Sequence, residues 1–299
     1  KNNYEIKLNS KEEDFDLIDK LFENKIELSK ILDLPRGIEI GSNSYKISKE
    51  YRYNYHKLLV GKDISKYSIN FSNKYIKFEN DLSVFKNLEI YQQPKILIQR
   101  IRNLTLKTRI VATLDSDNYL CTNTLRIGLL KNNKFDIRYV LSILNSKVIN
   151  WIFSKFFLNK DIYAYQLERL PIPEISLLQQ KEYIDLVNEI LELKKNIFKI
   201  KHNFTKIIAS NFKTKRIEFI NDFYKFDYNK FFNELKKDKV QIPFKQQTEL
   251  EEYFNENKNQ IISDIEKANS LENQINHLVY NLYDLTDSEI KIIEKIVNC

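Results

Sequence analysis

Apolar residues recur every three or four positions between the polar turn at 131–134 and Leu170, the spacing of one helix face. The stripe comprises Ile137, Val140, Leu141, Leu144, Val148, Trp151, Ile152 and Phe156. The opposite side carries Arg138, Ser142, Asn145 and Asn150. The pattern predicts a helical block with a buried apolar face and a free polar face.

Three further segments have helical periodicity. Residues 9–32 predict a helix with a capping box of Ser10 and Glu13, ending before Pro35 because proline lacks an amide donor. Residues 177–208 carry an apolar seam with heptad spacing: Tyr183, Leu186, Ile190, Leu193, Ile197, Ile200, Phe204 and Ile207. Residues 261–282 carry a second stripe that could lie antiparallel to this seam. The aromatic segment 219–232 between them is predicted to pack in a helical core.

The region from 45 to 130 has the pattern of short strands separated by turns. The predicted strands are 58–60, 67–71, 75–78, 95–101, 105–113 and 119–127. Between Glu89 and Asp115 there are five cationic residues and no acidic one. Alternation along 95–102 places Arg100 and Arg102 where the apolar face of the strand ends. The fold class is therefore α+β, a β-rich region followed by long antiparallel, coiled-coil-like helices.

The positive charge is concentrated in the middle of the chain. The 299 residues have a formal net charge of +7, and residues 31–175 contain 23 Lys and Arg against 13 Asp and Glu. The segments before and after this region each have a net charge close to zero. This distribution predicts a polyanionic partner for the middle region.

Several classes of protein are disfavoured by composition. Two cysteines without paired spacing and three separated histidines support neither a disulfide framework nor a metal site. No apolar run is long enough for a bilayer span, so we expect a cytoplasmic protein without membrane contact. The chain begins at Lys1 and contains no Met, so we expect it to be part of a longer polypeptide.

Four motifs stand out along the chain. One combines an Asn-Thr strand at 123–124, Leu144-Asn145-Ser146 with Trp151, and Leu170-Pro171-Ile172-Pro173. A Gly-Ile-x-x-Gly-x-Asn motif is matched by Gly37, Ile38, Gly41 and Asn43, and a Gly-x-Asp-Ile turn by Gly61, Asp63 and Ile64. The fourth motif is the segment 279–290, with Asp284 and with Thr286 and Glu289 as a capping box.

These motifs resemble those of the TaqI-like C-terminal specificity (target-recognition) domain of type IIG restriction-modification enzymes, which are adenine-N6 DNA methyltransferases. Residues 279–290 resemble the closing segment of single-chain type IIG enzymes, which usually have Gly where Asp284 stands here.

The resemblance implies three parts: a helical linker at 1–34 from a missing methyltransferase part, a DNA target-recognition domain at 35–175, and a helical domain at 176–299. It implies that the domain recognises double-stranded DNA and positions the target adenine for a methyltransferase or endonuclease domain of the same polypeptide or of a partner subunit. Two alternatives remain, a separate specificity subunit of a type I-like system and a structural coiled-coil interaction protein.

Catalytic motifs are missing from the sequence. The five prolines never occur in tandem and only four glycines are present, so neither the base-binding nor the methyl-donor loop of an adenine methyltransferase can be formed. We therefore expect no enzyme activity and no cofactor in this chain, with S-adenosylmethionine and Mg²⁺ bound only by the missing catalytic parts.

The DNA-binding candidates follow from the basic middle region. Base readout through the major groove is predicted for Gln99, Arg100, Arg102, Arg109, Asn123 and Arg126. Phosphate contacts are predicted for Lys46, Arg52, Lys57, Lys62 and Lys107.

Overall fold

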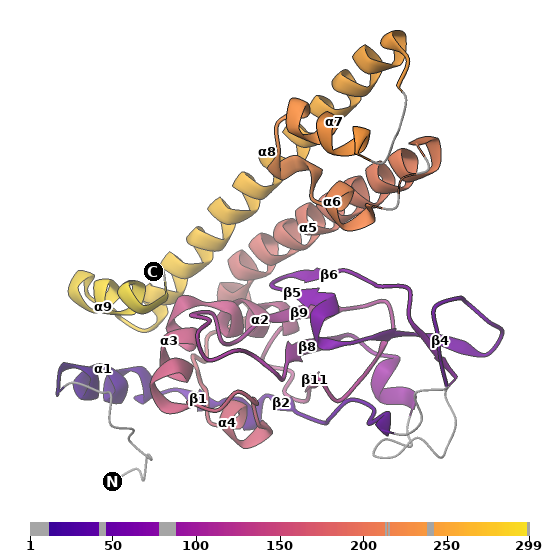
Figure 1. The fold of residues 1–299 in the computed structure, drawn as a ribbon. Helices are drawn as coiled ribbons and strands as arrows, with labels where there is room; N and C mark the ends of the chain where they lie inside the picture. Colours follow the sequence, from indigo (N-terminus) through magenta and orange to yellow (C-terminus); the bar gives the residue numbers. More distant parts are fainter. Residues whose placement is uncertain are drawn as a thin grey trace. The chain divides into compact units, whose positions relative to one another are not determined.

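A computed structural model describes residues 12–41, 46–77, 88–212, 214, 216–237 and 242–297. The chain forms two compact units (Figure 1): Lys1–Asn188 with Asn273–Cys299, and Glu189–Glu272. The first contains all described strands and the second is helical, which confirms the α+β class. The predicted division into domains at residues 34 and 175 remains a prediction. Ser10, Asn43 and the turn at 80–81 lie outside the described residues.

The amino-terminal helix is shorter than predicted. Helix α1 spans Glu12–Phe22, and Asn24 follows with a φ of 53°. Asparagine tolerates this left-handed conformation, so the chain leaves the helix there rather than at Pro35. Short elements follow: β1 (Ile26–Glu27), η1 (Leu28–Lys30) and β2 (Leu32–Asp33).

In the part of the chain that the structure describes, the β-rich region contains two four-stranded sheets and two strand pairs. The sheets have the orders β10-β4-β7-β3 and β2-β11-β8-β9, and the pairs are β1-β12 and β5-β6. The strands are β3 (Ile47–Ser48), β4 (Tyr55–Leu59), β5 (Ile64–Ser65), β6 (Ser68–Ile69), β7 (Tyr75–Lys77), β8 (Lys95–Gln99), β9 (Ala112–Asp115), β10 (Leu120–Cys121), β11 (Leu125–Leu130) and β12 (Pro171–Ile172). The 3-10 turns η3 (Gly61–Asp63) and η4 (Leu88–Tyr91) lie between these strands in the sequence.

Two predicted strands differ most from the structure. The predicted strand 105–113 is extended only from Ala112, because Arg102 side-chain donors occupy the Thr108 carbonyl and Asn150 accepts from the amides of 109 and 110. The predicted strand 119–127 is broken by a turn in which the Leu125 amide donates to the Thr122 carbonyl over 3.0 Å. This turn separates β10 from β11.

Helices α2 (Ile137–Asn145) and α3 (Lys147–Phe156) replace the single predicted block. Ser146, with a ψ of 158°, ends α2 and caps α3. The predicted free polar face is wrong, because Ser142, Asn145 and Asn150 are fully buried or nearly so. The Asn145 amide makes two hydrogen bonds with the backbone of Ala112 at the edge of β9. Asn145 and Asn150 are buried because they satisfy backbone groups of residues 109–112, whereas Ser142 Oγ donates to the Tyr139 carbonyl of its own helix.

The first unit is completed by elements distant in sequence. Helix α4 (Ala164–Glu168) precedes β12, which pairs with β1. The predicted capping box opens α9 (Asp287–Val297): the Thr286 amide donates to Glu289 over 2.7 Å.

The second unit is formed by parts of two long antiparallel helices, α5 (Leu177–Phe212) and α8 (Phe244–Leu282). Lys267 pairs with Glu189 and Asn196 with Asp264, which defines the antiparallel register. The short elements α6 (Ile217–Asn221), η5 (Phe223–Lys225) and α7 (Tyr228–Lys236) lie between them in sequence. Phe204, Phe223, Phe231 and Phe254 form a buried aromatic cluster, as predicted. The predicted seam position Ile207 is wrong: it is 41% exposed, whereas Ile208 is buried.

Candidate nucleic-acid interface

Three loops meet at the end of β8. The Gln99 side-chain amide donates to the Gly61 carbonyl over 2.8 Å and to the Ile64 carbonyl over 2.7 Å. The Gly61 amide donates to Thr124 Oγ1 over 2.8 Å, and the Arg100 amide donates to the Thr124 carbonyl over 3.0 Å. The turn at 61–64, the turn at 122–124 and the residues after β8 are therefore held together.

The Gly37 segment joins the same place. The Ile38 amide donates to the Cys121 carbonyl, and the Asn123 amide donates to the Ile38 carbonyl, each over 2.8 Å. A Cβ atom at Gly37 would lie 2.2 Å from the Thr122 carbonyl oxygen, so only glycine fits this close approach. The segment also pairs Arg36 with Arg126 across an isolated antiparallel bridge.

Arg36, Arg100 and Arg126 form what we call the arginine cluster. Burial lowers the pKa of Arg126, and the charges of Arg36 and Arg100 lower it further, whereas Glu168 opposes this effect. Arg126 is 6% exposed. In the described part of the chain, the Nε atom of each of the three is buried without a hydrogen-bond partner. The Asp161 carboxylate lies 4.0 Å from Arg100 Nη2, at the outer limit of an ion pair.

The cluster has the chemistry of an anion or guanine site. A guanidinium presents planar donors that match a phosphate or the O6 and N7 atoms of guanine. Like charges brought together at partial burial cost stability unless an anion offsets them. Arg36 was not among the sequence-based candidates, although its position before Gly37 in the Gly-Ile motif could have indicated it.

Two predicted base readers use their polar atoms inside the protein. Gln99 is 9% exposed, and its Oε1 atom accepts from Arg102 Nη1 over 2.9 Å. The Nη2 and Nε atoms of Arg102 donate to the Thr108 carbonyl over 2.7 and 3.3 Å. Burial lowers the pKa of Arg102. This network positions the end of β8.

Arg109 is anchored in a similar way. It is 3% exposed, and its guanidinium donates to the carbonyls of Asn159, over 2.5 Å, and Phe157, over 3.3 Å. Burial and the Arg102 charge lower the pKa of Arg109. Its backbone amide donates to Asn150 Oδ1 over 2.8 Å, so a helix residue predicted to be solvent-facing holds this segment in place.

Asn123 and the phosphate candidates lie in different settings. Asn123 is half-buried in the turn beside the arginine cluster, and Lys62 is exposed on the turn at 61–64. Arg52 and Lys57 are exposed, Lys107 is half-buried and Lys46 is buried. The Lys57 ammonium lies over the rings of Phe71 and Tyr119, at 5.7 and 5.5 Å from their centroids. The burial of these residues does not show whether they contact DNA. Their predicted roles in base readout and phosphate contact therefore remain predictions.

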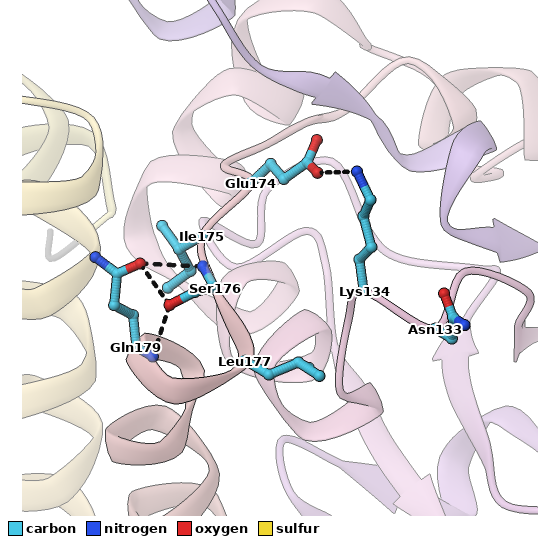
Figure 2. A pocket seen from close by; sticks show the side chains of 7 residues that line it. All are labelled: Asn133, Lys134, Glu174, Ile175, Ser176, Leu177 and Gln179. Atoms are coloured by element: carbon cyan, nitrogen blue, oxygen red, sulfur yellow. Dashed lines mark hydrogen bonds and ion pairs between the residues drawn. The ribbon is translucent and has the colours of Figure 1, made fainter.

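An open pocket of about 550 Å³ lies elsewhere in this unit, at the start of α5 (Figure 2). Lys134 pairs with Glu174 over 2.9 Å at its rim. The backbone amide of Gln179 donates to Ser176 Oγ. The backbone amide and the hydroxyl of Ser176 both donate to Gln179 Oε1. Four of the polar side chains that line this pocket are therefore paired, Lys134 with Glu174 and Ser176 with Gln179.

Metal and membrane features are absent from the part of the chain that the structure describes. No group of three or more His, Cys, Asp and Glu side chains is arranged to hold a metal ion. No helix there has both the length and the apolar character needed to cross a membrane.

Comparison with known proteins finds a family model that matches most of the β-rich region. Residues 56–172 match the family model of the TaqI-like C-terminal specificity domain, which confirms the resemblance predicted from the motifs. The match supports a role in DNA target recognition for this segment. Residues 176–279 match a domain of unknown function, DUF8810. No curated protein matches the chain.

A solved structure of the Type IIL restriction-modification enzyme MmeI in complex with DNA is similar to this chain at 10% sequence identity, with a TM-score of 0.43. The similarity covers 92% of this chain and 37% of that one. This chain therefore spans well under half the length of that enzyme.

Proposed function

We propose that this chain is the sequence-specific double-stranded DNA recognition part of a type IIG-like restriction-modification enzyme. In this proposal, residues 35–175 recognise the target and present the target adenine to a methyltransferase domain outside the chain. The observation that carries the proposal is the arginine cluster, which contains Arg100 and Arg126 from the segment that matches the specificity-domain model.

The contacts of each candidate suggest a division of roles. The guanidinium groups of Arg36, Arg100 and Arg126 donate no hydrogen bond to the described residues, so we assign them to guanine edges or phosphates. Asn123, in the adjoining turn, is assigned to an adenine edge and Lys62 to a phosphate. Gln99, Arg102 and Arg109 are assigned as positioning residues, because their polar groups hold backbone carbonyls. Phosphate contact remains our proposal for Lys46, Arg52, Lys57 and Lys107.

The experiment is enrichment of bound sequences from a random duplex library, at low and at physiological salt. Phosphate attraction alone weakens steeply with salt, whereas base readout survives. We expect the wild-type chain to enrich a motif that persists at the higher salt. Arg100→Ala should relax one position of that motif and cost about 1–3 kcal/mol on the preferred sequence.

Arg138→Ala is the matched control, because Arg138 lies on α2 with its guanidinium paired to Asp136 over 2.7 Å. It should leave the motif unchanged. An equal loss of affinity on every sequence for Arg100→Ala would reassign Arg100 to a phosphate. Absence of any motif at both salt concentrations would contradict sequence-specific recognition by this chain.

Two other functions predict different results. A separate specificity subunit of a type I-like system would bind DNA as here, but its gene would encode no methyltransferase motif upstream. A structural coiled-coil protein would oligomerise with increasing concentration and would not bind DNA at moderate salt. We propose that methyl transfer and cleavage, with S-adenosylmethionine and Mg²⁺, belong to the catalytic parts, and detectable turnover by this chain alone would contradict that assignment.

A further inference from the structure

Charge is unevenly distributed along the helical unit. Between Glu192 and Glu218 the sequence contains eight Lys and Arg and no acidic residue. The net charge of residues 176–299 is close to zero. The acidic residues of this region therefore lie outside the segment between Glu192 and Glu218. An ordinary solvent-facing helix mixes both signs of charge.

Five of these cations lie on the described helix α5, and their contacts separate them into two groups. Lys194 pairs with Glu272 and Lys201 with Asp222, each over 3.4 Å. Lys195, Lys199 and Lys206 are exposed and make no ion pair or hydrogen bond with the described residues. We call these three the lysine stripe.

Helical geometry places the lysine stripe on one face. At about 100° per residue, the three positions lie within roughly 40° of one another, and they extend over about 16 Å at 1.5 Å per residue. His202, also exposed, lies between Lys199 and Lys206 on this face. The buried Phe204 lies roughly opposite, so the stripe is on the side away from the core.

The lysine stripe matches a polyanion in spacing and sign. Lys195 and Lys199 are four positions apart, where like charges repel one another and destabilise a helix. A bound anion removes this repulsion. Duplex DNA carries one negative charge per about 1.7 Å of its axis. A length of duplex equal to the stripe, about 16 Å, therefore carries about nine phosphate charges.

We propose that the lysine stripe of α5 is a second, sequence-independent DNA-binding surface, which contacts the phosphate backbone of duplex DNA. The choice of duplex DNA among polyanions rests on the proposed function of the recognition region. Because both surfaces belong to one chain, binding at one raises the local concentration of DNA at the other. The stripe therefore adds affinity without adding sequence preference.

The test measures the slope of log affinity against log salt concentration for the full chain on duplexes of unrelated sequence. Each phosphate contact contributes about 0.9 to this slope. We expect K195Q/K199Q/K206Q to reduce the slope by about two to three and to weaken binding equally on all sequences. The arginine triple variant at the same positions should keep the wild-type slope, since it keeps the charge.

K30Q/K181Q/K291Q is the matched control, because these exposed lysines lie outside the stripe and their loss changes the net charge equally. It should change the slope by less than about one. The proposal is overturned if K195Q/K199Q/K206Q leaves the slope unchanged. It is also overturned if this variant loses binding to anionic vesicles while its affinity for DNA stays the same. Absence of a preferred sequence would count against the proposed function alone, so the two failures are distinguishable.

Discussion

The Tyr283 hydroxyl donates a hydrogen bond of 2.5 Å to the carbonyl of Pro171, 112 residues away in the sequence. The closing segment 279–290 and the Leu-Pro-Ile-Pro segment, which the sequence presents as two separate motifs, therefore form one structural unit. Tyr139 adds to it with a hydrogen bond of 2.8 Å to the Pro173 carbonyl. Burial raises the pKa of Tyr283 well above its ordinary value, which keeps its hydroxyl a donor.

Tyr283→Phe should lower the free energy of unfolding by about 1 kcal/mol, because the variant loses one buried hydrogen bond while keeping the ring. Urea unfolding at neutral pH measures this loss. Tyr55→Phe is the control, since no hydrogen bond of the Tyr55 hydroxyl is present in the described part. Equal stability of the Tyr283 variant and the wild type would show that this hydrogen bond contributes nothing.

Asp284→Gly should stabilise the protein by about 0.5–1 kcal/mol. Asp284 has a φ of 52°, which a residue with a Cβ atom adopts at a cost and glycine adopts freely. The left-handed turn gives a physical reason for the glycine that is usual at this position in the type IIG closing segments that residues 279–290 resemble. Asp284→Ala should be destabilising. Aspartate adopts the left-handed conformation more readily than alanine, because its short polar side chain can form local hydrogen bonds. Thermal unfolding of both variants checks the prediction, and a lower melting temperature for Asp284→Gly contradicts it.

Gln99→Ala should destabilise the protein by about 1–3 kcal/mol, because the carbonyls of Gly61 and Ile64 lose a shared donor. Asn123→Ala, at a half-buried turn position without a side-chain hydrogen bond to the described residues, should change stability by less than about 0.5 kcal/mol. Denaturant unfolding distinguishes the two. The same stability for Gln99→Ala and wild type, together with a changed DNA motif, would restore Gln99 as a base reader.

Lys95→Met should cost about 3–5 kcal/mol near neutral pH, because it leaves the fully buried Asp115 carboxylate without the ammonium 2.7 Å away. Burial raises the pKa of Asp115, and the Lys95 charge opposes this, so the substitution raises the pKa further. The folded value then lies above the unfolded value of about 3.9. The folded state takes up a proton as pH falls, and the deficit of the variant should shrink as the pH is lowered from neutral towards that unfolded value.

Urea unfolding across this pH range checks the trend against wild type. Lys134→Met is the control, because its ion pair with Glu174 is exposed and should contribute little at any pH. A deficit of Lys95→Met that is constant with pH would contradict the role assigned to the Asp115 charge.

The sequence by itself determined the features that depend on neighbouring residues. Helical periodicity identified α5 and α8, and the Thr286 and Glu289 pair identified the cap of α9, because both follow from the geometry of consecutive residues. The motifs led to the specificity-domain family, which the match over residues 56–172 confirms.

Only the tertiary structure decided which polar residues belong to the candidate nucleic-acid interface and which form hydrogen bonds inside the protein. Arg36, Arg100 and Arg126 meet because strand pairing and the close approach at Gly37 join segments distant in sequence. Gln99 and Asn150 look like surface residues in a periodic pattern, yet they are buried against backbone groups from other segments. Local spacing does not encode such partners, because a polar side chain is buried only where a distant segment supplies its hydrogen bonds.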